Sequence, residues 1–228
     1  TPRVFWDTNI YKLNQHLSSQ QALALQQYHA KFVQPLLDLI LKTGKTGEDA
    51  SVTFARTDDY IEAVAALERN EYGMSKGLTK PLVVAKQGQT LTQANDYFRS
   101  VIAKYKSPEM DAVMTQLQKI NNERLRLLEE FKIVPKEVID AWRGAYKVYM
   151  PFKSWENLIE EADPAWYKSS TRKSLSTPGA QRRIMARATG RDGEAQSPIT
   201  HAILQLYDVS NLTKTVEVGR SLLRLVKD

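Results

Sequence analysis

The stretch "SPEMDAVMTQLQKINNERLRLLEEF", residues 107–131, predicts a long amphipathic helix. Ser107 stands where an N-cap is expected, Pro108 occupies the first helical position, and Glu109 places an acid in the first turn. Arg124 is the one departure from the apolar face, whose large side chains recur three or four positions apart. These apolar side chains are Met110, Val113, Met114, Leu117, Ile120, Leu128 and Phe131.

Helical periodicity continues on both sides of this stretch. Residues 12–43 carry an apolar stripe that Pro35 is expected to kink or divide. Residues 54–72 predict a second helix, and the loop 43–51 separates the two. Three further helix starts are predicted from capping residues and prolines: Thr90 with Gln93 for a helix to about Lys104, Pro135 for one to about Tyr146, and Ser197-Pro198 for the last.

Strand-type alternation is not sustained anywhere, and residues 82–85 are the only short exception. We therefore expect an irregular, extended all-α fold with long amphipathic helices and a basic loop or arm. The expected organisation is a helical domain at 1–166, a basic linker or arm at 167–197 and a C-terminal helix at 198–228. The chain begins Thr-Pro-Arg, which suggests a fragment of a longer protein.

The composition bounds the possible functions. The chain has 228 residues, of which 42% are hydrophobic, enough for a sizeable core. It contains no Cys, which excludes disulfide scaffolds, cysteine zinc sites, iron–sulfur clusters and thiol catalysis. Its apolar runs are short and interrupted by charges, so no membrane-spanning segment is expected.

The sequence offers no coherent set of catalytic or metal-binding residues. The loop 43–51 lacks the phosphate-loop pattern, and His16 and His29 lack a partner at helical metal-ligand spacing. The acidic pairs, such as Asp58-Asp59, are sequence neighbours, which on a helix do not converge. We therefore expect no catalytic residue, metal or cofactor, and a protein that is not an enzyme.

Positive charge is concentrated between residues 168 and 191, where no acid interrupts it, although the net charge of the chain is only +6. Ser and Thr residues between the basic side chains suit contacts with a phosphate backbone without reading of bases. An arm that pairs with acids of a neighbouring subunit, or a solvated arm, is the alternative. The candidate nucleic-acid-binding residues are Lys168, Arg172, Lys173, Arg182, Arg183, Arg187 and Arg191.

The stretch "AYKVYMPFKSW", residues 145–155, ends a predicted helix at an aromatic corner. Pro151 restricts the preceding residue to extended geometry, so the helix is expected to end by about Tyr149. Tyr149, Phe152 and Trp155 are expected to pack there rather than to form a ligand cage or a base-stacking platform.

Three segments of the chain resemble the large internal virion (ejection) proteins of tailed phages and related giant polyvalent proteins of phages and mobile elements. The first is "NNERLRLLEEFKIVPKEVIDAWRGAYKVYMPFKSW", residues 121–155; the others are "AALERNEYG", residues 65–73, and the Gly-Arg…Pro-Ile start at residues 190–199. The family motif has a Leu-Leu-x-x-Gly step, a helix with a Trp and then Tyr-Val-Pro-Leu-Arg. Phe131 or Lys132 stands here in place of the Gly. The matching motif residues are Trp142, Tyr149, Pro151, Phe152 (for Leu) and Lys153 (for Arg), with Trp155 beside them.

This resemblance implies a non-enzymatic helical segment of a very large protein that is packaged in the capsid and builds a conduit through the host envelope. It implies a homo-oligomer whose partners are other virion proteins and phage DNA, with membrane contact only through other parts of the parent. The expected location is the virion and then the host envelope or periplasm. The alternative is a nucleic-acid-binding module of a polyvalent antirestriction or mobile-element protein.

Overall fold

The computed structural model describes residues 10–86, 88–145 and 197–227, and within these ranges every regular element is a helix. The prediction of an all-α fold is therefore confirmed. The described elements are α1 (Ile10–Tyr28), the π turn η2 (His29–Val33), α2 (Gln34–Lys42), α3 (Ala50–Ser75), α4 (Leu91–Tyr105), α5 (Pro108–Glu130), α6 (Lys136–Ala145) and α10 (Pro198–Lys227).

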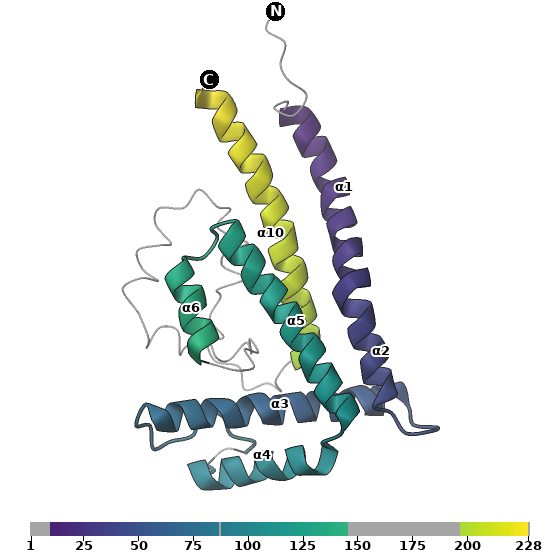
Figure 1. The fold of residues 1–228 in the computed structure, drawn as a ribbon, viewed down its shortest axis with the longest axis vertical. Coiled ribbons are helices and arrows are strands. Elements are labelled where there is room, and N and C mark those ends of the chain that lie inside the picture. Colours follow the sequence, from purple (N-terminus) through teal and green to yellow (C-terminus); the bar gives the residue numbers. More distant parts are fainter. Residues whose placement is uncertain (1–9, 87, 146–196, 228) are drawn as a thin grey trace, which may run out of the picture.

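The helix predicted at residues 12–43 is present. The irregularity expected from Pro35 lies about one turn before the proline, at residues 29–33. The π turn η2 precedes Pro35, and the backbone N–H of Gln34 bonds to the carbonyl of His29, five residues back. Proline lacks an N–H and its ring crowds the carbonyl four residues before it, so the chain widens locally instead of continuing as a regular α-helix. The helix direction is kept across this turn (Figure 1).

Helix α3 is longer than the range 54–72 that the sequence predicts. It begins at Ala50 because the Asp49 carboxylate accepts the backbone N–H of Ser51 at 2.7 Å, and it continues to Ser75. The predicted loop therefore ends at Asp49, and residues 68–71 lie inside the helix rather than at its end.

The predicted caps of α4 and α5 are confirmed. Thr90 and Gln93 form both bonds of a capping box, and the Ser107 hydroxyl accepts the N–H of Met110 at 3.2 Å. Ser197 likewise precedes α10 and its hydroxyl accepts the N–H of Thr200 at 3.1 Å. Residues 82–85 form no strand; the backbone of Leu82 and Val83 bonds instead to Asn70, as described below.

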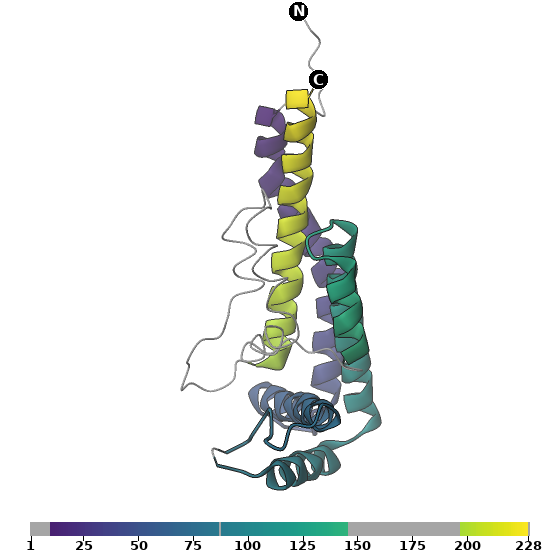
Figure 2. The same ribbon diagram turned by 90° about the vertical axis from the view of Figure 1, so that its left-hand side faces the viewer.

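Helices α1, α5 and α10 run along the length of the molecule, and α3 and α4 lie across one end (Figures 1 and 2). Helix α1, continued by α2, lies beside α10, which in turn packs against α5. Helix α3, with α4 packed on it, lies across the end where α2, α5 and α10 converge (Figure 1), and the main cluster extends from there along α5 to Leu128 and to Ile139 of α6.

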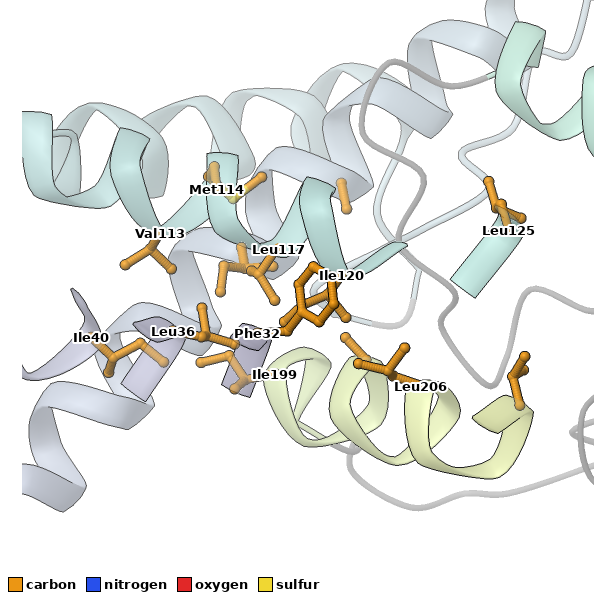
Figure 3. Close-up of a cluster of buried hydrophobic side chains, with 14 of the residues drawn as sticks. Phe32, Leu36, Ile40, Val113, Met114, Leu117, Ile120, Leu125, Ile199 and Leu206 are labelled. Carbon is orange, nitrogen blue, oxygen red and sulfur yellow. The ribbon is translucent and has the colours of Figure 1, made fainter. Parts of the chain in front are cut away.

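One large hydrophobic cluster joins helices from distant parts of the sequence. Leu36 of α2, Leu117 of α5 and Leu206 of α10 are all fully buried in it (Figure 3). Helix α10 follows residues 167–197, yet it contributes Ile199 and Leu206 to the cluster formed by α2, α3 and α5. Among the described helices, none combines the length and apolarity needed to cross a bilayer.

Candidate functional site

Most residues that the sequence nominates as a site lie outside the part of the chain that the structure describes. This holds for the basic set Lys168, Arg172, Lys173, Arg182, Arg183, Arg187 and Arg191, and for Tyr149, Pro151, Phe152, Lys153 and Trp155. Trp142 is the exception: it lies in α6, is partly buried and packs against the main hydrophobic cluster. This placement agrees with packing as the role of Trp142.

Polar side chains in the described part of the molecule meet where helices join, and Asn70 is the centre of one such junction. Its Nδ2 donates to the Val83 carbonyl at 3.0 Å and to Asn95 Oδ1 at 2.9 Å. Its Oδ1 accepts the backbone N–H groups of Leu82 and Val83, each at 2.9 Å. Asn70 thus holds residues 82–83 in place of a strand partner and links α3 to α4.

The sequence "AALERNEYG" is therefore a structural clamp in α3. Arg69 and Asn70 stand near Gly73, a pattern from which the sequence predicts capping of a helix end. That prediction is wrong: Asn70 is 1% exposed, Arg69 is 3% exposed, and both lie inside α3. Gly73 completes the clamp, because a Cβ there would lie 3.0 Å from Leu82. The sequence does not reveal that residues 76–86 fold back over these positions, where Leu82 and Val83 bond to Asn70.

Asp58 of α3 forms a second junction by capping α10 across 141 residues of sequence. Its carboxylate accepts the backbone N–H of Ile199 at 3.2 Å and the Ser197 hydroxyl. A carboxylate at a helix N-terminus satisfies an N–H that lacks a helical partner and interacts favourably with the helix dipole. Burial nevertheless raises the pKa of Asp58, because it penalises the charged form more than these bonds favour it.

Two further acids lie close to Asp58 on α3. Burial raises the pKa of Glu62, and the neighbouring charges of Asp59 and Asp58 raise it further. Within the described ranges, no group of three or more His, Cys, Asp or Glu side chains has an arrangement that would hold a metal ion. Of these carboxylates, that of Asp58 joins α3 to α10.

The corner between α2 and α3 is held by an ion pair. Arg56 lies 2.5 Å from the Glu48 carboxylate and also donates to the Thr43 carbonyl at 2.7 Å. Thr53 donates to the same carboxylate at 2.9 Å. The bond from Arg56, followed by the Lys45 backbone N–H, lowers the pKa of Glu48 to about 2.

The C-terminal end of α5 is bonded to α10. Arg220 donates to the Phe131 carbonyl at 2.6 Å, and its guanidinium lies 6.0 Å from the centre of the Phe131 ring. Lys132 follows with φ of 51°, a left-handed backbone conformation. The Gly of the resembled family motif corresponds either to Lys132 or to Phe131.

Arg124, which interrupts the apolar stripe of α5, is buried and 5% exposed. It has interaction partners, as buried charged groups generally do. Gln116, on the same helix, donates to the Phe32 carbonyl in the π turn at 2.9 Å. The polar residues of α5 thus position neighbouring segments.

Comparison of the chain with models of known protein families found no match, and neither did comparisons with curated proteins or with solved structures. The site that the geometry defines is a set of helix junctions: Asn70 with residues 82–83 and Asn95, Asp58 with the start of α10, Glu48 with Arg56, and Arg220 with Phe131.

Proposed function

We propose that this chain is a structural and assembly segment of a phage internal virion (ejection) protein, which helps to form a conduit for genome delivery. The observation that carries the proposal is the side-by-side course of α1 and α10 along the length of the molecule, away from the end where α3 and α4 lie (Figure 1). Long paired helices of this kind offer lateral surfaces for packing between subunits. The resemblance at residues 121–155 supplies the class of protein.

In this proposal the chain acts passively, and its polar side chains hold helices at fixed angles. It forms a homo-oligomer with other virion proteins as neighbours and with phage DNA nearby. It resides inside the capsid and then in the host envelope or periplasm, with membrane contact made by other parts of the parent protein.

The test is to tag the parent gene in an infecting phage and to follow the product by mass spectrometry. We expect the tagged protein in purified virions and its loss from the capsid after ejection. A protein present only in infected cells and absent from virions would refute the assignment. A second measurement, light scattering on the purified chain, is expected to show an oligomer.

The second candidate is a nucleic-acid-binding module, favoured by the run of basic residues without an acid from Lys168 to Arg191. Contacts of these side chains with phosphates predict an affinity for DNA that falls steeply as salt rises. Replacing Arg182, Arg183 and Arg187 together with Ala is expected to reduce the slope of log K against log salt by about 2–3.

The matched control replaces three exposed lysines elsewhere, Lys45, Lys80 and Lys86, with Ala, which removes the same charge. The control chain is expected to keep most of the affinity. Equal losses in both variants would mean that net charge alone matters, and unchanged binding in the arginine variant would exclude the basic run as the site.

A further inference from the structure

The junction between α1 and α2 has the properties of a hinge. The π turn His29–Val33 interrupts the regular α-helical hydrogen bonding, and Pro35 cannot restore it. The turn is fixed to the core by Gln116, whose side chain donates to the Phe32 carbonyl in a buried bond of 2.9 Å. Tyr28 stacks on Phe32 with ring centres 6.0 Å apart. The π turn is therefore fixed to the core and can serve as a pivot for the helix on either side of it.

The two sides of this turn differ sharply in burial. On the α2 side, Leu36 and Ile40 are both 0% exposed, and Phe32 in the turn is 7% exposed. On the α1 side, only Ala24 is buried among the described side chains at 17–28, and Leu23 is 55% exposed. Because few side chains at 17–28 are buried, separating this part of α1 from the molecule is expected to cost less than separating α2.

The hydrogen bonding between α1 and α10 is weak. Gln21 of α1 donates to the Asn211 carbonyl at 3.4 Å, close to the limit for a hydrogen bond. The shorter contact, 2.9 Å between His29 Nδ1 and the Tyr207 hydroxyl, belongs to the π turn and holds the pivot against α10. On α10, the buried Ser210 Oγ and Asn211 Oδ1 have no hydrogen-bond partner among the described residues. Buried polar atoms without partners cost free energy in the closed arrangement of α10.

We propose that α1 is a hinged arm that opens from α10 about the π turn while α2, α3, α5 and α10 stay folded, and that the opened arm pairs with α10 of a second copy. The choice of a second copy as the partner rests on the proposed assembly function. An exchanged α1 remakes the contacts it had within its own chain, so no new surface is required. Residues 13–30 contain no Asp, Glu, Lys or Arg, so two arms approach without repulsion between such side chains.

Hydrogen exchange followed by mass spectrometry on the whole chain tests the hinge. We expect the amides of residues 14–28 to exchange together, more than about tenfold faster than those of α2 and α5, with a step at His29–Val33. Protection of α1 equal to that of α5 would overturn the hinge. A smooth gradient of exchange that rises toward residue 10 would also overturn it, because that pattern is end fraying.

Cross-linking tests the exchange, and the absence of Cys from the chain makes single introduced thiols unambiguous. The Gln21→Cys chain and the Asn211→Cys chain are mixed and treated with a short bis-maleimide. A covalent dimer linked through these two positions is expected. The matched control pairs Gln21→Cys with Asp140→Cys, an exposed position on α6, and is expected to give at most a trace of dimer.

The two proposals fail in different ways. An oligomer seen by light scattering without a covalent dimer above the control overturns the exchange and leaves the assembly function standing. A chain that stays monomeric at all concentrations overturns both. Circular dichroism of each thiol variant confirms beforehand that the helices are intact, so a negative result is informative.

Discussion

Asn70 illustrates how one side chain in this molecule replaces a secondary-structure element. An amide side chain has two donors and an acceptor oxygen with two lone pairs, and Asn70 uses all of this capacity on Val83, Leu82 and Asn95. The backbone at 82–83 thereby obtains the hydrogen bonds that a neighbouring strand would otherwise supply.

The Asn70→Ala change is expected to lower the free energy of unfolding by about 2–3 kcal/mol, because it leaves buried backbone groups without partners. Urea unfolding followed by circular dichroism measures the loss. Asn122→Ala on the exposed face of α5 is the control, with an expected change within about 0.5 kcal/mol. Equal stabilities of the two variants would mean that Asn70 does not hold the segment.

Glu62 provides a test of electrostatics at a single residue. Burial, and then the charges of Asp59 and Asp58, raise its pKa, so the ionised carboxylate is less favourable in the folded chain than in the unfolded one. Protonation of Glu62 therefore stabilises the folded chain relative to the charged form. This stabilisation is fully present below the pKa of Glu62 in the unfolded chain and is lost as pH rises through its pKa in the folded chain.

The Glu62→Gln change is therefore expected to raise the melting temperature at pH 7 and to have no such benefit near pH 3. Melting curves across this pH range measure the difference. Glu48→Gln is the opposite control, because the bond from Arg56 lowers the pKa of Glu48 to about 2. That control is expected to destabilise the protein at pH 7, with a penalty that shrinks as pH falls from about 4.5 toward 2. A Glu62→Gln chain that is less stable at pH 7 would contradict the reasoning.

At the scale of elements, the turn from α5 to α6 depends on backbone conformation. Lys132 adopts φ of 51° directly after the C-cap of α5, a position that glycine occupies with least strain. The Lys132→Gly change is expected to raise stability by about 0.5–1 kcal/mol, measured by urea unfolding. Lys136→Gly, at the first residue of α6, is expected to lower it. A lower stability of the Lys132→Gly chain would show that the Lys132 side chain stabilises the fold by more than its backbone strain destabilises it.

The starts of α4, α5 and α10 were predictable because the hydrogen bonds that cap these helices are local. Thr90, Ser107 and Ser197 each act within three residues of their own position. The bond between Asp58 and α10 was not predictable, because its two partners are 141 residues apart and an acidic pair on a helix resembles any solvated face.

The junction at Asn70 was misread for a related reason. A polar residue near a glycine suits a helix end as well as a buried clamp, and only the return of residues 76–86 over α3 distinguishes the two. The basic run at 168–191 and the aromatic corner after Trp142 stay predictions, because they lie outside the described residues. The role of Trp142 in packing was accessible from its place on the apolar side of a short helix.

At the scale of the whole molecule, the question is whether α10 belongs to the same cooperative unit as α3 and α5. The sequence divides the chain before residue 198, whereas Leu206 is fully buried in the cluster that contains Leu36 and Leu117 (Figure 3). Asp58 and Arg220 add polar ties from α10 to α3 and to the end of α5. A shared core predicts that a destabilising substitution in α10 also lowers the stability of the other helices.

The Leu206→Ala change creates a cavity in this shared cluster, so it is expected to lower the free energy of unfolding by about 2–5 kcal/mol. Hydrogen exchange on the same variant is expected to show faster exchange of α3 and α5 amides as well as those of α10, because a cooperative unit loses protection throughout. Leu204→Ala, two positions away and 51% exposed in the parent chain, is the matched control, with an expected change within about 0.5 kcal/mol. Loss of protection confined to α10 would instead establish α10 as a separate unit, docked on a core that folds without it.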